Sequence, residues 1–209
     1  MEWLALSVGG LMGWWIPGVT GRIFLSEPKR ERGIQPSMAA MGAVGFWLLV
    51  TSSLTVGEQV MGGLFLLFLL AAVALDLSCR LIPNRLNGMA ALGFLVVRLL
   101  SGQEVLLSLG AGLFGGGILL AISLLSRGGM GGGDVKMAAV AGFALGWPKV
   151  ATGLGLGIIS GGLWASFLLI TGRADRKTPL PFAPHLAIGF FVSCLWGEKL
   201  LHRYLSLYS

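Results

Sequence analysis

Charged residues are scarce in this chain. Asp, Glu, Lys and Arg make up 11% of the 209 residues, whereas hydrophobic residues make up 55%, and the mean hydropathy is +0.84. Soluble domains carry about 25% charged residues, so this chain has too little polar surface to cover a water-soluble globule. The composition therefore excludes an ordinary soluble domain and predicts an all-α, polytopic integral membrane protein.

Cysteine is also rare, and the two that are present lie in different kinds of segment. Cys79 falls in a gap between apolar runs, and Cys194 falls inside the last apolar run. We therefore expect no disulfide between them, and without a Cys-x-x-Cys pair we expect no zinc site. The sequence predicts neither a metal nor a cofactor.

Long apolar runs are abundant, and their lengths predict the architecture. A helix needs about 20 residues to cross the hydrocarbon core of a bilayer, with some tolerance on either side. Eight runs meet this need approximately, although the sixth is short and is expected to be tilted or partly recessed. We expect a bundle of about eight transmembrane helices over residues 3–21, 38–56, 60–75, 86–100, 105–125, 135–147, 150–170 and 183–198.

The basic residues are distributed unevenly between the gaps. With eight crossings, 11 of the 15 Lys and Arg residues fall in one set of gaps, and the other set holds four, which are Arg98, Lys149, Lys199 and Arg203. Cytoplasmic loops carry the excess of Lys and Arg, so we predict a multi-pass protein of the inner (cytoplasmic) membrane with both termini outside. Because membrane orientation accounts for the net charge of +6, we do not expect nucleic acid as a partner.

No polar stretch is long enough to fold as a separate domain. The longest lies at residues 26–37, is interrupted by proline, and belongs to a short cytoplasmic loop over residues 22–37. We therefore predict a single integral membrane domain over residues 1–209.

Aspartate is the rarest charged residue, and two of the three aspartates lie at the ends of apolar runs. Asp76 and Asp134 fall at the same predicted cytoplasmic face, whereas Asp175 lies among basic residues, where a solvated ion pair explains it. A carboxylate beside an apolar run is costly, so two at one face suggest a shared site. Two adjacent carboxyls share a proton and titrate as a unit, which suits activation of water and protonation of a leaving amine.

The residues around the two aspartates are also informative. Pro83 follows Asp76 by seven residues and is expected to shape the exit of the third helix, while Asn84 and Asn87 offer polar side chains to cap or orient the next helix. Lys136 follows Asp134 by two residues. It either interacts with the aspartate pair or anchors the helix at the lipid headgroups.

A glycine run precedes the second aspartate. Residues 128–133 (GGMGGG) include Gly131, Gly132 and Gly133, and they lack a Cβ at all but one position. We expect left-handed or closely approaching backbone here, against which an extended peptide substrate can pair. Nucleotide binding is excluded, because a phosphate-binding loop requires Lys where this chain has Asp134.

Three segments resemble one known family. Residues 76–84 (DLSCRLIPN) are similar to the first aspartate motif of the type IV prepilin peptidases, and residues 131–137 (GGGDVKM) resemble their Gly-x-Gly-Asp motif. Residues 181–189 (PFAPHLAIG) are similar to the start of their last helix. The three segments occur in the family's order, and the expected eight helices agree with its longer bacterial members.

The resemblance implies an intramembrane-type aspartic endopeptidase that removes the basic leader of prepilins and pseudopilins at the cytoplasmic face, in type IV pilus assembly or protein secretion. Asp76 and Asp134 would be its catalytic pair, without metal or covalent intermediate. Many members also methylate the new amino terminus and carry paired cysteines between their first two helices. The short loop over residues 22–37 contains no cysteine, so the sequence gives no support for methyl transfer and leaves that activity open.

Two other classes of protein remain as alternatives. A proton-coupled transporter would place its aspartates near the middle of the bilayer and contain related repeats. A noncatalytic assembly factor for pili or secretion would keep the helices without needing both aspartates. The aspartates at helix ends and the adjoining glycines favour the peptidase.

Overall fold

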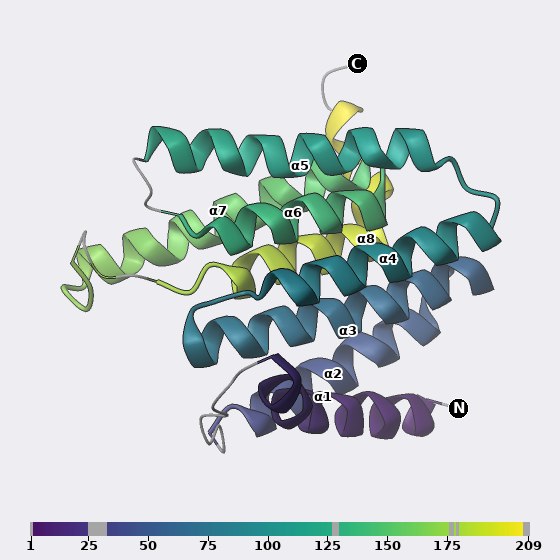
Figure 1. The fold of residues 1–209 in the computed structure, drawn as a ribbon, viewed down its shortest axis with the longest axis horizontal. Helices are drawn as coiled ribbons and strands as arrows, with labels where there is room; N and C mark the ends of the chain where they lie inside the picture. The colour runs from purple at the N-terminus through teal and green to yellow at the C-terminus, as the bar shows by residue number, and fades with distance from the viewer. Residues whose placement is uncertain (1, 25–32, 127–129, 176–177, 179, 207–209) are drawn as a thin grey trace.

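The computed structural model describes residues 2–24, 33–126, 130–175, 178 and 180–206, and these residues form eight α-helices and no β-strand (Figure 1). The predicted all-α bundle is confirmed. The helices are α1 (Glu2–Phe24), α2 (Gln35–Thr51), α3 (Val56–Cys79), α4 (Asn84–Leu100), α5 (Val105–Leu125), α6 (Gly132–Leu145), α7 (Lys149–Ile170) and α8 (Ala183–Leu205).

The surface of the bundle suits lipid. Of the described helices, α3, α5 and α7 are long and apolar enough to cross a membrane. Large apolar side chains stand exposed along α5 and α7, for example Leu113 and Leu163, and a soluble protein rarely leaves so much apolar surface uncovered. The chain is therefore a multi-pass membrane protein, while the eight crossings remain a prediction.

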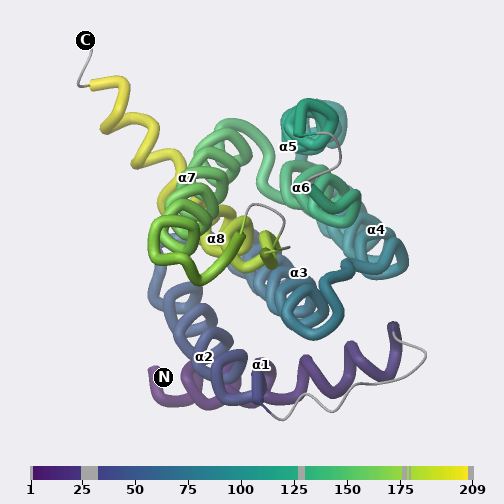
Figure 2. Tube along the Cα trace, turned by 90° about the vertical axis from the view of Figure 1, so that its left-hand side faces the viewer, coloured from purple at the N-terminus to yellow at the C-terminus, as the bar shows by residue number. Residues whose placement is uncertain are grey.

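Helix α3 lies in the middle of the bundle. Every residue from Phe68 to Asp76 is buried, and α3 contacts α1, α2, α4, α6 and α8 (Figure 2). Its start is fixed by a capping box, in which Thr55 and Glu58 exchange side-chain and backbone hydrogen bonds. It ends where Arg80 adopts a left-handed conformation with φ of 55°. The central helix therefore carries Asp76 one turn before its end.

The ends of four helices meet at one end of the bundle. The last turn of α3 and the first turns of α4, α6 and α8 all lie at the left-hand end in Figure 1. We call this the aspartate end, because Asp76 and Asp134 lie on these turns, and we call the opposite end the distal end. The predicted loop over residues 22–37 lies largely at positions 25–32, outside the described residues, and the single domain stays a prediction.

Helix α6 is shorter than its neighbours, as the sequence predicts. Its 14 residues extend about 21 Å at 1.5 Å per residue, less than the roughly 30 Å of a hydrocarbon core. Arg98 of α4 completes its distal end, because Nε donates to the carbonyl of Phe143 (3.0 Å) and Nη2 to that of Ala144 (2.9 Å). Arg98 is 7% exposed. The structure therefore buries a residue that the sequence analysis counts among the basic residues of the gaps between apolar runs.

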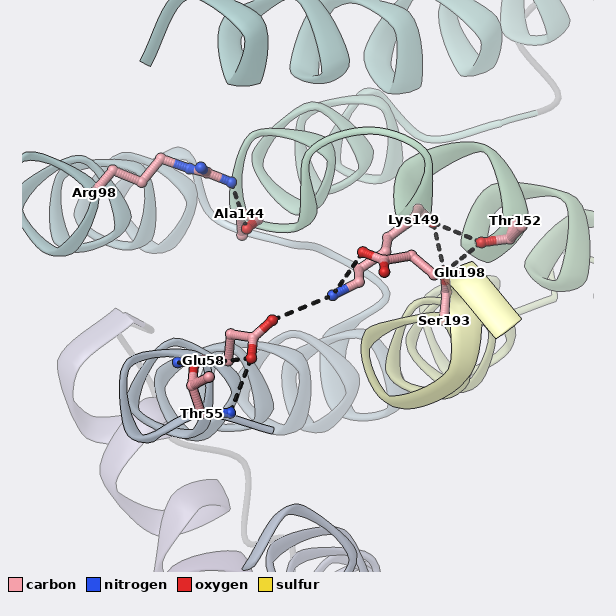
Figure 3. A network of polar contacts seen from close by, with 8 residues as sticks. All are labelled: Thr55, Glu58, Arg98, Ala144, Lys149, Thr152, Ser193 and Glu198. Atoms are coloured by element: carbon pink, nitrogen blue, oxygen red, sulfur yellow. Dashed lines mark hydrogen bonds and ion pairs between the residues drawn. The ribbon is translucent and has the colours of Figure 1, made fainter. Parts of the chain in front are cut away.

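Other polar groups at the distal end also contact one another (Figure 3). Lys149 Nζ lies 3.4 Å from a carboxylate oxygen of Glu198 and 4.0 Å from one of Glu58, so it bridges α3, α7 and α8. Together with Arg98, these residues form what we call the distal network. A cavity of about 540 Å³ is lined by Glu58, Arg98 and Lys149, far from the aspartates.

Glycines on α7 position α8. A Cβ added at Gly153 would lie 2.7 Å from the ring of Phe190, and one at Gly157 would lie 3.0 Å from Leu186. Only glycine permits so close an approach of the two helices. This packing fixes α8, whose first residue, Ala183, reaches the aspartate end.

Candidate active site

Asp76 is held between two helices. It lies on α3, is 6% exposed, and its Oδ2 accepts a hydrogen bond from the backbone N–H of Ala183 at 3.1 Å. Ala183 is the first residue of α8, where backbone N–H groups have no partner within the helix and favour a negative charge. The start of α8 thus orients the buried carboxyl group of Asp76, although Ala183 and Asp76 are 107 positions apart in the sequence.

Asp134 lies in the first turn of α6 and is 9% exposed. Its backbone N–H donates to the carbonyl of Gly131 at 3.1 Å. Among the described residues, its Oδ1 has no hydrogen-bond partner although it is buried. A buried carboxyl oxygen without a partner is costly, so this atom needs an explanation and marks Asp134 as a candidate functional residue.

The two carboxyl groups lie close enough to interact. Helices α3 and α6 are in contact, and Asp134 lies within range of the charge of Asp76. Both side chains are buried, and they lie on the last turn of α3 and the first turn of α6, which are at the same end of the bundle in Figure 1. The structure therefore places the two predicted aspartates on contacting helices at one end of the bundle, and their role as a catalytic pair stays a prediction.

Gly133 brings the second motif against the first. A Cβ at this position would lie 3.1 Å from Cβ of Ile82 and 3.3 Å from its carbonyl oxygen. Ile82 is buried and follows Asp76 by six residues. The close approach predicted for the glycine run is confirmed here, because a side chain at residue 133 would push the two motifs apart.

Of the two backbone conformations expected for the glycine run, left-handed or closely approaching, the left-handed one does not occur at the three described glycines before Asp134. Gly131 is the N-cap of α6, with φ of −69°, and Gly132 and Gly133 already belong to the helix, without positive φ. The first turn needs no left-handed residue, because the chain enters the helix from an extended N-cap. Gly128 and Gly129 lie outside the described residues, and pairing with an extended peptide stays a prediction.

Pro83 and Asn84 lie at the start of α4, and a hydrogen bond between Asn84 and Lys136 connects this start to α6. Pro83 is the N-cap of α4, so it begins that helix, whereas α3 has already ended at Arg80. Lys136 Nζ donates to Oδ1 of Asn84 at 2.7 Å. This hydrogen bond links the two helices. The predicted contact of the exposed Lys136 with headgroups or with the aspartates stays a prediction.

The sequence does not reveal several residues that shape the site. The sequence predicts Asn87 to cap or orient a helix. The structure instead buries this side chain, and in the described part of the chain both of its amide atoms lack a hydrogen-bond partner. Ala183 and Ile82 act through their backbone and packing, which their residue types do not signal. The proline-rich start of α8 at residues 181–184 is the one available hint of a helix terminus.

The comparisons with known proteins add to this geometry. Residues 64–170 match the model of the type IV leader peptidase family. The chain belongs to this family. Its matched segment contains both aspartates and all the predicted loop residues between them, and no solved structure matches the chain.

Members of the type IV leader peptidase family from several bacteria are similar to the chain, each named prepilin leader peptidase/N-methyltransferase. The Bacillus subtilis (strain 168) protein is 33% identical over 147 residues, which cover 68% of this chain and 58% of that protein. The Aeromonas salmonicida (strain A449) protein is 32% identical over 166 residues, covering 76% and 57%. The chain therefore matches less than two thirds of the length of these relatives.

The remaining acidic and cysteine side chains weighed in the sequence analysis are Asp175, Cys79 and Cys194. Asp175 is exposed, as expected, and its basic neighbours at positions 176 and 177 lie outside the described residues. Within the described residues, no disulfide joins Cys79 and Cys194. Within the part of the chain that the structure describes, no three His, Cys, Asp or Glu residues gather as a metal site.

Proposed function

We propose that this chain is a membrane aspartic endopeptidase that removes the leader peptide of prepilin or pseudopilin substrates. The observation that carries the proposal is the placement of Asp76 and Asp134, two buried carboxyl groups from separate motifs, on contacting helices at one end of the bundle, with one oxygen of Asp134 lacking a hydrogen-bond partner among the described residues. Family membership supports the substrate class, since the similar proteins are named prepilin leader peptidases.

The proposed reaction is hydrolysis of one peptide bond by general acid–base catalysis. One carboxylate of the pair accepts a proton from water as the water attacks the scissile carbonyl, while the other carboxyl, protonated, donates a hydrogen bond to that carbonyl. The protonated group then gives its proton to the departing amine. The N–H of Ala183 holds Asp76 in place during these steps, and no residue forms a covalent bond to the substrate.

We place the reaction at the cytoplasmic face of the inner membrane. The excess of Lys and Arg in the gaps at the aspartate end supports this orientation, and the products would serve pilus assembly or protein secretion. The proposal includes one domain over residues 1–209 and does not extend to methyl transfer, because the loop at residues 22–37 contains no cysteine.

The transporter and the noncatalytic assembly factor are less well supported. A carrier would hold its carboxylates near the middle of the bundle, whereas both aspartates lie at helix ends on one side. A noncatalytic relative would have no use for two desolvated carboxyl groups, which are costly to bury.

Co-expression with a candidate prepilin tests the proposal. Wild-type protein should convert the prepilin to a shorter product, and Asp76→Asn and Asp134→Asn should not, because either change removes half of the proton exchange. Asp175→Asn is the matched control, since it makes the same change at an exposed aspartate. Normal processing by either active-site variant would refute the assignment.

A further inference from the structure

Asn87 is a buried side chain that the proposed reaction does not use. It lies on α4 and is 4% exposed, and neither its amide oxygen nor its amide nitrogen has a hydrogen-bond partner among the described residues. In the same part of the chain, the one other buried side-chain oxygen or nitrogen without a partner is Oδ1 of Asp134. An unpaired buried amide is costly and calls for an explanation, and the shared state of these two groups points to the active site.

The face of α4 that carries Asn87 packs against both helices of the aspartate pair. Asn87, Phe94 and Arg98 follow one another at spacings of seven and four residues, so they share one face of the helix. The ring centre of Phe94 lies 6.0 Å from that of Phe65 and 5.9 Å from that of Phe68 on α3. Arg98 donates to two carbonyls of α6. Asn87 therefore lies on the side of α4 that faces α3 and α6.

Asn87 also lies near the level of Asp76 along the bundle. The contact of Phe94 with Phe65 and Phe68 gives a common reference point on α3 and α4. Asn87 is seven residues from Phe94 toward the aspartate end, which is about 10 Å, and Asp76 is eight to eleven residues from the two α3 rings toward the same end, which is about 12–16 Å. The two side chains thus differ in level by about one helical turn at most.

The contact with α6 gives a similar placement relative to Asp134. Asn84, one turn before Asn87, accepts a hydrogen bond from Lys136 Nζ at 2.7 Å, and Lys136 follows Asp134 by two residues. The first turns of α4 and α6 lie at the same end of the bundle (Figure 1). The Asn87 amide and Oδ1 of Asp134 are therefore two unpartnered groups in the first turns of contacting helices.

We infer that Asn87 binds the peptide backbone of the substrate beside the scissile bond, an inference that rests on the proposed function. The amide oxygen accepts hydrogen bonds and the amide nitrogen donates them. A residue in an extended peptide presents its N–H and C=O on one side, as it does when it exchanges both bonds with a partner strand. One substrate residue thus satisfies both amide atoms, whereas a hydrogen bond to Asp134 would satisfy only one of them.

Asn87→Leu tests this role through two separate effects. Leucine has a similar volume and removes both amide atoms, so kcat/KM for a prepilin that the wild type cleaves should fall about 10-fold. The thermal midpoint should stay or rise, because the wild type buries an amide that no described protein group satisfies. Ser193→Ala is the matched control. Its buried hydroxyl donates to the carbonyl of Lys149 at 2.6 Å, so this variant should have a lower midpoint and an unchanged kcat/KM.

A modified substrate backbone separates contact with the peptide from a structural role. In synthetic prepilin peptides, each of the two peptide bonds that flank the scissile bond is replaced in turn by an ester, which removes the N–H. At one of the two positions the ester should lower the wild-type kcat/KM about 3-fold or more. It should have no further effect in Asn87→Leu, or in Asn87→Ala, which removes the amide without adding volume.

Three results would overturn the inference and leave the peptidase intact. The first is an ester that has no effect on the wild type at either position. The second is an ester effect that simply adds to the effect of the Asn87 variants, since the ester then acts elsewhere. The third is a lower midpoint in both Asn87 variants, which would make the asparagine structural. Failure of the wild type to cleave any prepilin would overturn both the inference and the proposed function.

Discussion

Buried polar groups at the two ends of the bundle differ in whether other protein groups pair or hydrogen-bond with them. At the distal end, Lys149 pairs with Glu198 and Glu58, and Arg98 binds two helix carbonyls and the side chain of Gln103. At the aspartate end, Oδ1 of Asp134 and both amide atoms of Asn87 are buried, with no protein partner among the described residues. Mutually satisfied groups hold helices together, whereas unsatisfied ones are free to bind water or peptide.

Helix α4 connects the two ends. Arg98 in its last turn binds the distal end of α6, and Asn84 in its first turn binds Lys136 near the start of α6. Asp134 is thus carried by a short helix that is held at both ends by the same neighbour. If the two ends differ in this way, substitutions in the distal network should reduce the stability of the protein. Substitutions at the aspartate end should reduce the rate of leader cleavage.

The largest effect is expected at the aspartates. Asp76→Asn and Asp134→Asn should each lower the rate of leader cleavage at least about 100-fold, because a general acid or base contributes about 10²–10⁴-fold. The thermal midpoint of the purified protein should stay near that of the wild type, since the volume is kept. Equal loss of cleavage in Asp175→Asn would show that the effect is not specific to the pair.

Arg98→Gln should mainly destabilise the protein. It leaves the carbonyls of Phe143 and Ala144 with fewer donors at a buried position, at a cost of about 2–4 kcal/mol. Thermal unfolding in detergent measures the loss, with Lys199→Gln on the exposed surface as the control. If Arg98→Gln kept the thermal midpoint of the wild type but abolished cleavage, the distal end would serve catalysis and not stability, contrary to the expected difference between the two ends.

Gly133→Val should impair cleavage through steric overlap with Ile82. The added side chain costs roughly 1–3 kcal/mol of overpacking and moves α6 away from the segment after Asp76. Gly132→Val is the matched control, because nothing lies within 4 Å of a Cβ at that neighbouring position. If both variants cleave at the same rate in the prepilin assay, the close approach is not needed.

The smallest effect is expected at Lys136. Lys136→Met removes one exposed hydrogen bond to Asn84, so the free energy of unfolding should fall by at most about 1 kcal/mol. Denaturant titration gives the change in stability, and Asn84→Ala should reproduce it. A loss of cleavage comparable to that of Asp134→Asn would mean that Lys136 acts on the aspartates themselves.

Much of the fold follows from the length of the apolar runs, but the helix ends do not. The second expected span, 38–56, passes through the break at residues 52–55, where Thr55 and Glu58 start a new helix by capping. The last expected span ends at residue 198, whereas α8 continues through Glu198 and Lys199 to Leu205. Hydropathy averages over such signals, since caps and charged helical turns depend on single residues.

The candidate site is predicted only in part for a related reason. Asp76 and Asp134 stand out, because carboxylates are rare beside apolar runs. The contacts of Ala183 with Asp76 and of Arg98 with Phe143 join residues 107 and 45 positions apart. One uses a backbone N–H and the other a backbone carbonyl, which every non-proline residue possesses, so the sequence gives no sign of them.

Direct bridging of the two site positions is the sharpest test of the account. In a background with Cys79→Ser and Cys194→Ser, the variant with both Asp76→Cys and Asp134→Cys should be joined within one chain by a short bifunctional thiol reagent. Mass spectrometry of the digested protein detects the bridged peptides. The account predicts efficient bridging, whereas single labelling of each thiol without a bridge, or labelling from opposite faces of the membrane, would contradict it.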